Sequence, residues 1–319
     1  MRSAGIVRMV VVLGSVASVA GCSQIDKLKA RKAFKDANAA YQGQDYRKAV
    51  QLYQEVIATN PDEVRAYFYL ANSYDQLYKS DRPDDPANRQ NIEKAVNFYQ
   101  TSAEKLVKAD TPENKILERR SYEYLAAAYG EDRLNDAAKA EPIIQKMIQM
   151  EPTEPTNYIR LARLYEDAGV YDEAEAMYLR AREVKPSDPV VYTTLAAYYN
   201  RRGEFDKTIK ALEERAAKEP NNPEAFHTIA SYYWDETRND PKLRENEKRD
   251  YIQKGIQAAD KAIQLKPDYV EAITFKGLLL RLQALVEKDP GKQKALLEEA
   301  KTLSDKANGL QQKKTSASN

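Results

Sequence analysis

The sequence predicts an all-α protein, a solenoid of about six to seven repeated helix pairs within 319 residues. The first observation is a spacing of 34 residues between matching sets of side chains. The second is that the large and small apolar residues of each set recur at intervals of three and four, which places them on one helical face. The third is that prolines open and close these sets, as expected where a helix begins or cannot continue.

The repeat is clearest in the middle of the chain. One pattern of large, aliphatic, small and large residues occurs there three times, as Tyr158-Leu161-Ala162-Tyr165, Tyr192-Leu195-Ala196-Tyr199 and Phe226-Ile229-Ala230-Tyr233. Pro155, Pro189 and Pro223 open these units. Small residues such as Ala162 are expected where the two helices of a pair approach closely, and Gly169 is expected to end the first helix.

Looser matches extend the repeat in both directions. We predict units at about residues 30–61, 63–109, 113–152, 155–186, 189–220, 223–267 and 270–312. The second and sixth units carry insertions around Lys79–Asn91 and Asp235–Lys248, which lack the calcium-binding loop pattern and are expected to be solvated loops. The seventh unit lacks a closing proline, and its polar last helix suits a solenoid cap. Residues 313–319 are expected to be a disordered tail.

This pattern resembles the tetratricopeptide repeat (TPR), a helix–turn–helix unit of the same period. The resemblance covers roughly Ala30 to Gln312. It implies a superhelical solenoid whose inner surface is lined by the first helix of each pair. Such a surface suits an extended or helical peptide rather than a small-molecule substrate.

The tyrosine content is unusual, with 22 Tyr against 6 Phe and 1 Trp. Half of these tyrosines fall at the large-residue packing positions of the repeat, so we expect them in the core rather than in a binding cage. They are Tyr67, Tyr74, Tyr99, Tyr122, Tyr129, Tyr158, Tyr165, Tyr178, Tyr192, Tyr199 and Tyr233.

The residues between the packing positions of the first helices are expected to line the inner surface. We predict partner contacts at Phe68, Asn72, Ile159, Arg163, Asn200, His227 and Trp234. Trp234 lies seven residues after His227, so the two share a helical face, and a large aromatic group there predicts a binding hot spot. The alternative is that Trp234 packs against the inserted segment 235–248. Only Asn72 matches the clamp with which TPR co-chaperones bind acidic C-termini, so the resemblance does not extend to that ligand.

Composition excludes several classes of function. With 50 basic and 49 acidic residues, the chain lacks the positive charge of a protein that binds nucleic acid through many phosphates. One His and one Cys argue against a metal site, and there is no glycine-rich nucleotide motif. We therefore expect no cofactor, no metal and no enzymatic activity, since no catalytic constellation is visible.

The N-terminal residues predict export. Residues 9–20 are uncharged and follow two arginines, which is typical of a secretory signal and too short for a membrane span. They end at Val19-Ala20-Gly21-Cys22, which resembles the lipobox of bacterial lipoproteins. The resemblance implies a signal peptide at 1–21, lipid attachment to Cys22 and a short tether at 22–29. The alternatives are a plain signal peptide with an incidental Cys, or an anchor that is retained.

Together these features predict a lipid-anchored TPR scaffold in the bacterial cell envelope. Ser23 after the Cys favours the periplasmic face of the outer membrane, by the sorting rule of enterobacterial lipoproteins. The expected partners are proteins or peptides bound in the inner groove. An alternative is an assembly factor, pilotin-like or serving outer-membrane proteins, with one dedicated partner.

Overall fold

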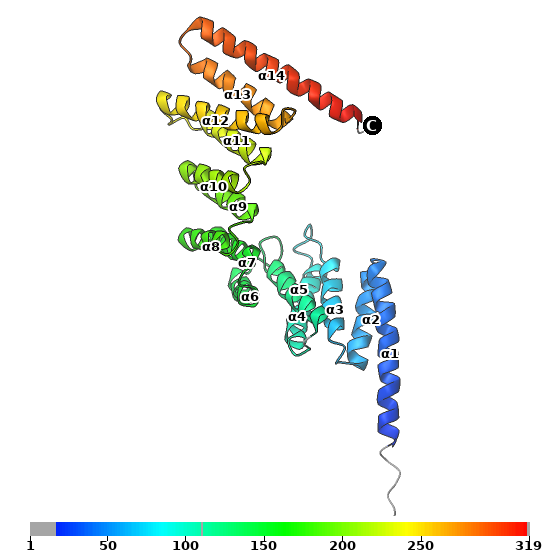
Figure 1. The fold of residues 1–319 in the computed structure, drawn as a ribbon. Helices are drawn as coiled ribbons and strands as arrows, with labels where there is room; N and C mark the ends of the chain where they lie inside the picture. The colour runs from blue at the N-terminus through cyan, green and yellow to red at the C-terminus, as the bar shows by residue number, and fades with distance from the viewer. Residues whose placement is uncertain (1–16, 110, 318–319) are drawn as a thin grey trace, which may run out of the picture. The chain divides into compact units, whose positions relative to one another are not determined.

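The computed structural model describes residues 17–109 and 111–317, and for residues 17–27 it describes the backbone alone. The described chain contains fourteen α-helices and no β-strand, which confirms the all-α class. Successive helices form antiparallel hairpins, and the chain divides into two compact units after Pro152 (Figure 1). Residues 1–16 of the predicted signal peptide and the side chain of Cys22 lie outside the described residues.

Unit 1 is built from three hairpins. Its helices are α1 (Ala17–Gln42), α2 (Tyr46–Thr59), α3 (Val64–Leu77), α4 (Pro86–Leu106), α5 (Pro112–Ala128) and α6 (Ala137–Met150). The two helices of each hairpin contact each other, and α2 contacts α3 as α4 contacts α5. The hairpins are therefore stacked in the order of the chain.

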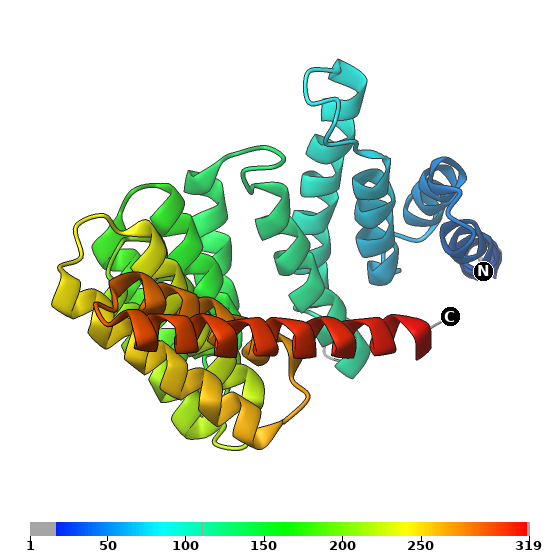
Figure 2. The ribbon, with the colours of Figure 1, turned by 90° about the horizontal axis from the view of Figure 1, so that it is seen from above.

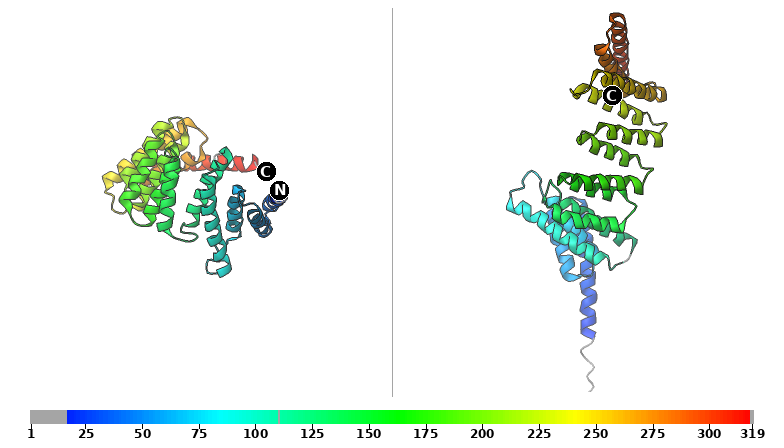
Figure 3. Two further views of the ribbon diagram at one scale, coloured as in Figure 1. Left: turned by 90° about the horizontal axis from the view of Figure 1, so that it is seen from below. Right: turned by 90° about the vertical axis from the view of Figure 1, so that its left-hand side faces the viewer.

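Unit 2 is built from four hairpins. Its helices are α7 (Pro155–Asp167), α8 (Tyr171–Val184), α9 (Pro189–Arg201), α10 (Phe205–Lys218), α11 (Pro223–Asn239), α12 (Glu245–Leu265), α13 (Val270–Val286) and α14 (Pro290–Ala317). Each hairpin contacts the next through the first helix of its successor. The right-hand view of Figure 3 shows α9 and α10 between their neighbouring pairs.

Local sequence explains where the first helices begin. Proline occupies the first turn of α7, α9 and α11, where a missing backbone N–H removes no helical hydrogen bond. The preceding side chain then caps the helix: Asp188 accepts a hydrogen bond from the amide of Val190 at 3.0 Å, and Asn222 accepts one from Glu224 at 3.0 Å. These contacts satisfy amides that the first turn leaves free.

Glycine ends the first helix where the turn is tightest. Gly169 and Gly203 follow α7 and α9 with φ of 75° and 70°, a left-handed conformation that favours glycine. After α7 the amide of Val170 donates to the carbonyl of Tyr165 at 2.8 Å, which closes the helix end. The chain can then reverse into α8 within three residues.

The core alternates small and large side chains. Ala162 and Ala174 are fully buried where α7 meets α8, and Tyr178 is 1% exposed beside them. All of the predicted core tyrosines are buried except Tyr122 and Tyr165, which are half-buried. Close helix contact at alanine and gap filling by tyrosine therefore occur together, as the repeat pattern predicted.

The two insertions are partly helix, not loop throughout. In the second unit only residues 78–85 lie between helices, because α4 already begins at Pro86. Buried Asn88 fixes this loop by donating to the carbonyls of Lys79 and Arg82, each at 2.7 Å. In the sixth unit, α11 and α12 extend into the insertion and leave only residues 240–244 between them.

Two terminal segments also differ from expectation. Helix α1 runs through residues 22–29, which we predicted to be a tether. Helix α14 has 28 residues and continues to Ala317, through most of the tail that we predicted to be disordered. Its C-terminal turns extend well past the first turn of α13, to which α14 runs antiparallel (Figure 2). No helix among the described residues is long and apolar enough to span a membrane.

Candidate protein-binding surfaces

The predicted contacts Phe68 and Asn72 on α3 are internal residues. Phe68 is 3% exposed, and its ring packs against Tyr69 and Tyr124 with centroid distances of 5.4 and 6.0 Å. Asn72 is 2% exposed. Neither side chain is available to a partner, so the prediction of groove contacts at these two positions is wrong.

Asn72 belongs to a buried polar network in unit 1. Its side-chain oxygen accepts a hydrogen bond from the Tyr41 hydroxyl at 2.6 Å, and its side-chain nitrogen donates to the Tyr99 hydroxyl at 2.9 Å. The Tyr99 hydroxyl donates in turn to Asp75 at 3.2 Å, and Arg133 forms an ion pair with Asp75. Burial and the neighbouring Asp75 raise the pKa of Tyr99, so its hydroxyl stays protonated and remains a donor. The network ties α1, α3, α4 and the α5–α6 loop together.

His227 and Trp234 on α11 pack against the next hairpin. The Trp234 ring lies 5.5 Å from the ring of Phe275 on α13, and the His227 ring lies 5.2 Å from Phe275 and 5.4 Å from Tyr269. Both side chains are half-buried. Trp234 therefore does pack, against Phe275 of α13 and also against Arg238 of the inserted segment, whose guanidinium lies 5.2 Å from the centre of the Trp234 ring.

The His227 imidazole has no hydrogen-bond partner among the described residues. Both ring nitrogens are buried and unpaired. Burial lowers the pKa of His227, and this effect outweighs the opposing influence of Glu271 and Glu224. The neutral ring acts here as a packing group, which is the opposite of an exposed binding residue.

A second aromatic position, two residues after the first packing position of a unit, explains these outcomes. Tyr69 contacts Phe34 and Tyr41 of the preceding hairpin at 6.3 and 5.6 Å, in the same way that Phe275 contacts His227 and Trp234. The corresponding residues of the three middle units are Arg160, Thr194 and Thr228. Where this position is aromatic, its ring packs against the inner side chains of the previous hairpin and covers them. The signal is present in the sequence, but it lies outside the packing positions from which the groove contacts were predicted.

The inner surface of unit 2 stays open where that aromatic residue is absent. Arg163 and Asn200 are exposed, as predicted for groove residues, whereas Ile159 is 8% exposed and belongs to the core. Between them, Arg201 on α9 makes a bidentate ion pair with Glu166 on α7 at 2.7 and 2.9 Å, and this pair lowers the pKa of Glu166. The Tyr178 hydroxyl also donates to Glu166 at 2.9 Å. The exposed surface of α7 and α9 is therefore polar and held in place by a charge pair.

Unit 1 instead presents half-exposed aromatic rings. Phe34, Tyr41, Tyr69 and Tyr124 are all half-buried, and we call them the aromatic patch. The Arg65 guanidinium lies 5.1 Å from the centre of the Phe34 ring. Partial burial raises the pKa of Tyr41 to about 12. Neutral rings with polar edges are well suited to contact a peptide backbone.

The described residues do not show a metal-binding group. No cluster of three or more His, Cys, Asp or Glu side chains lies within the distances that a metal ion requires there. Some acidic residues of the two insertions accept hydrogen bonds from nearby backbone amides, as Asp85 does from Ala87 at 2.9 Å.

Stacked helix hairpins with small residues at the close contacts define a helical-repeat protein. Residues 34–83 and 133–198 match family profiles described as Tetratricopeptide repeat. These two segments are tetratricopeptide repeats, as the sequence pattern predicted. No curated protein matches the sequence.

Of the three known structures described next, the first, with a TM-score above 0.5, agrees on the fold. The C-terminal part of a TPR repeat-containing protein from Cytophaga hutchinsonii is 14% identical, with a TM-score of 0.56 over 87% of this chain and 98% of that chain. YrrB, described as a TPR protein with an unusual peptide-binding site, is 14% identical over 66% of this chain and 96% of that chain, with a TM-score of 0.42. A MamA fragment from Desulfovibrio magneticus RS-1 is 15% identical over 61% of this chain and 96% of that chain, with a TM-score of 0.40.

Proposed function

We propose that this chain is a non-enzymatic scaffold that binds partner proteins and is anchored by a lipid to a bacterial envelope membrane. The observation that supports binding most directly is the set of inner residues that packing leaves accessible. These are Arg163 and Asn200 in unit 2 and the aromatic patch in unit 1. Peptides are recognised by shape and local contacts, which polar residues in a fixed arrangement and half-exposed aromatic rings can provide.

Site-specific photo-crosslinking in the native host tests this function. A benzophenone amino acid is placed at Tyr124 or Asn200, and at Lys210, an exposed residue on the second helix of a hairpin, as the control. We expect protein adducts from the two inner positions and none from Lys210. Equal adducts at all three positions, or adducts at Lys210 alone, would contradict an inner binding surface.

The same experiment separates a general scaffold from an assembly factor. A scaffold should give several adducts of different mass, whereas a factor with one dedicated partner should give a single species from both inner positions. The near-neutral charge of the chain favours neither class of partner, because long-range steering is weak.

The anchor is proposed from the sequence, on the lipobox-like Val19-Ala20-Gly21-Cys22 and the absence of any other Cys. Two lipid chains are needed for stable attachment, and lipoproteins of this class carry at least that many. Growth with labelled palmitate should mark the wild-type chain and leave Cys22→Ala unlabelled. The wild type should fractionate with the outer membrane, which would place the scaffold on its periplasmic face. Equal labelling of both forms would exclude lipidation at Cys22.

A further inference from the structure

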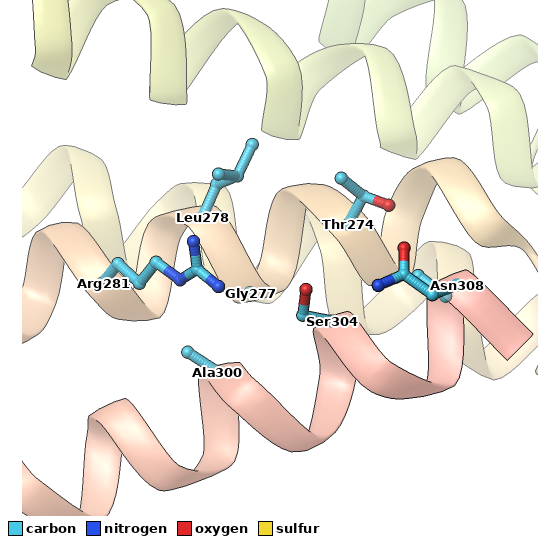
Figure 4. A pocket seen from close by; sticks show the side chains of 8 residues that line it. Thr274, Gly277, Leu278, Arg281, Ala300, Ser304 and Asn308 are labelled. Carbon is cyan, nitrogen blue, oxygen red and sulfur yellow. The ribbon is translucent and has the colours of Figure 1, made fainter.

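The last hairpin carries an open groove between α13 and α14, which we call the end groove. It encloses a cavity of about 80 Å³. Its walls are Thr274, Gly277, Leu278, Arg281, Ala300, Ser304, Ala307 and Asn308 (Figure 4). Four of these residues come from each helix, so the groove follows the length of the hairpin.

Every earlier hairpin of unit 2 has this surface covered by the first helix of its successor. Helix α9 packs on α7 and α8, α11 packs on α10, and α13 packs on α11 and α12. Among the described residues, no helix follows α14 to cover the end groove. The chain itself therefore shows what kind of element fits there: an α-helix.

The contact between α12 and α13 indicates which side chain such a helix must supply. A Cβ added at Gly255 of α12 would lie 3.0 Å from two side-chain carbons of Leu279, so α13 fills this site with a leucine. Ala300 and Ser304 lie 45 residues after Gly255 and Ala259 and occupy the same places on α14. They are small like their counterparts; Ala300 is fully buried within the last hairpin, whereas Ser304 is only half-buried and lines the end groove. An incoming helix therefore needs a large apolar residue.

The groove continues into exposed apolar surface. Leu285 is 78% exposed and lies four residues after Arg281, on the same face of α13. Leu297 is 48% exposed and lies three residues before Ala300 on α14. Two exposed leucines at the mouth of a groove are unlike the polar cap that we predicted for the last repeat, and such patches mark interaction sites.

Polar groups without partners are spread along the groove. The side chains of Arg281, Ser304 and Asn308 form no hydrogen bond or ion pair with the described residues, and Figure 4 shows all three directed toward the space between the helices. A guanidinium with free donors recognises a carboxylate, with which it forms two parallel hydrogen bonds. The occupant should thus carry an acidic side chain among its apolar ones.

We propose that the end groove binds an amphipathic helix of a partner protein that presents a large apolar residue to Ser304 and a carboxylate to Arg281. The proposal rests on the scaffold function, but places this contact in the last hairpin alone. Charge disfavours a second copy of the chain in this role. A symmetric pair in which two end grooves face each other would bring the two Arg281 side chains together, and the exposed residues of α1 include three lysines, Lys29, Lys32 and Lys35, against one acidic residue, Asp36.

Two synthetic helical peptides test the proposal. Both carry leucines spaced three and four residues apart, with glutamate in the middle of the leucine face of one and lysine at that place in its twin. We expect the glutamate peptide to bind the full chain at least tenfold more tightly than its twin, measured by fluorescence anisotropy. Arg281→Glu should reverse this preference.

A second part of the test fills the groove with a large side chain. Ser304→Tyr should lower the affinity for the glutamate peptide at least tenfold. The matched variant Ser316→Tyr, at an exposed position near the end of α14, should bind this peptide as the wild type does. Circular dichroism of both variants verifies that they are folded. Equal affinity for the two peptides, or full binding by Ser304→Tyr, would overturn the proposal.

Analytical ultracentrifugation of the same variants tests whether a second copy of the chain occupies the groove instead. Self-association of the wild type that disappears in Ser304→Tyr would assign the groove to a second copy and overturn the proposal. If the peptides fail to bind but crosslinks persist at Tyr124 and Asn200, the end groove is excluded and the scaffold function is retained.

Discussion

At the scale of single residues, the difference between a packing side chain and a binding side chain depends on one neighbour. Trp234 and His227 were predicted to face a partner because they lie between the packing positions of the repeat, at the places that exposed Asn200 and Thr193 occupy one unit earlier. Phe275 on the next hairpin covers them, whereas Thr228 at the same place leaves Asn200 open. The repeat pattern of one unit alone contains no information about this neighbour, so it could not distinguish packed Trp234 from exposed Asn200.

The first prediction at this scale concerns Trp234. Because its ring packs between α11 and α13, Trp234→Ala should lower the free energy of unfolding by about 2 kcal/mol, less than the loss for a fully buried tryptophan. Asn200→Ala, on the exposed surface, should change stability by about 0.5 kcal/mol or less. Urea denaturation of both variants measures the difference. Equal stability of the two variants would show that Trp234 makes no structural contact.

The second prediction concerns the pH dependence that His227 imposes. Its pKa is lowered in the folded chain, so protonation favours the unfolded state. The neutral ring contributes fully to the stability of the fold above its unfolded pKa of about 6.5. This contribution is lost as the pH falls through the lower pKa of the folded chain. The melting temperature should fall more steeply between pH 7.5 and pH 5 for the wild type than for His227→Phe.

The wild type must be compared with His227→Phe because other groups titrate in the same pH range. Glu224 and Glu271 act on the imidazole, and Glu224 also pairs with Arg215 at 3.2 Å. These groups are present in both chains, so their effects cancel in the difference. Parallel pH profiles for wild type and His227→Phe would exclude His227 as the source.

At the scale of helices, the sequence predicted where hairpins occur better than how long their helices are. Proline, caps and small residues act locally, so α7, α9 and α11 begin at the prolines that the repeat pattern marked. The lengths of α12 and α14 depend on burial against neighbours, which a 34-residue frame does not encode. Both helices are longer than a standard unit allows, with 21 and 28 residues.

The prediction at this scale tests the close contact between α7 and α8. Ala162 is fully buried. Replacing it by Leu would force the two helices apart, at a cost of about 1–3 kcal/mol or more. Thermal unfolding followed by circular dichroism should show a lower and broader transition. The matched change Ala168→Leu, at an exposed position directly after α7, should melt as the wild type does.

At the scale of the whole molecule, a stack of hairpins carries its stability in contacts between neighbours. Short-range contacts dominate both units, and a side chain such as Trp234 or Asp75 acts on its own or an adjacent hairpin. A local defect should therefore stay local. A chain of this kind can keep one binding surface intact while another is altered, which suits a protein that holds several contacts.

The network around Asp75 provides the test. Its side chain is 2% exposed and pairs with Arg133, while Tyr99 also donates to it. Asp75→Ala leaves both partners without their acceptor, and loss of one member of a buried ion pair costs about 3–5 kcal/mol. Native-state hydrogen exchange should accelerate most in α3, α4 and the α5–α6 loop, because these are the elements that the network joins. Helices α11 to α14 should keep their protection. Uniform acceleration along the whole chain would mean that the solenoid unfolds as a single cooperative block, and that its binding surfaces are not energetically separable.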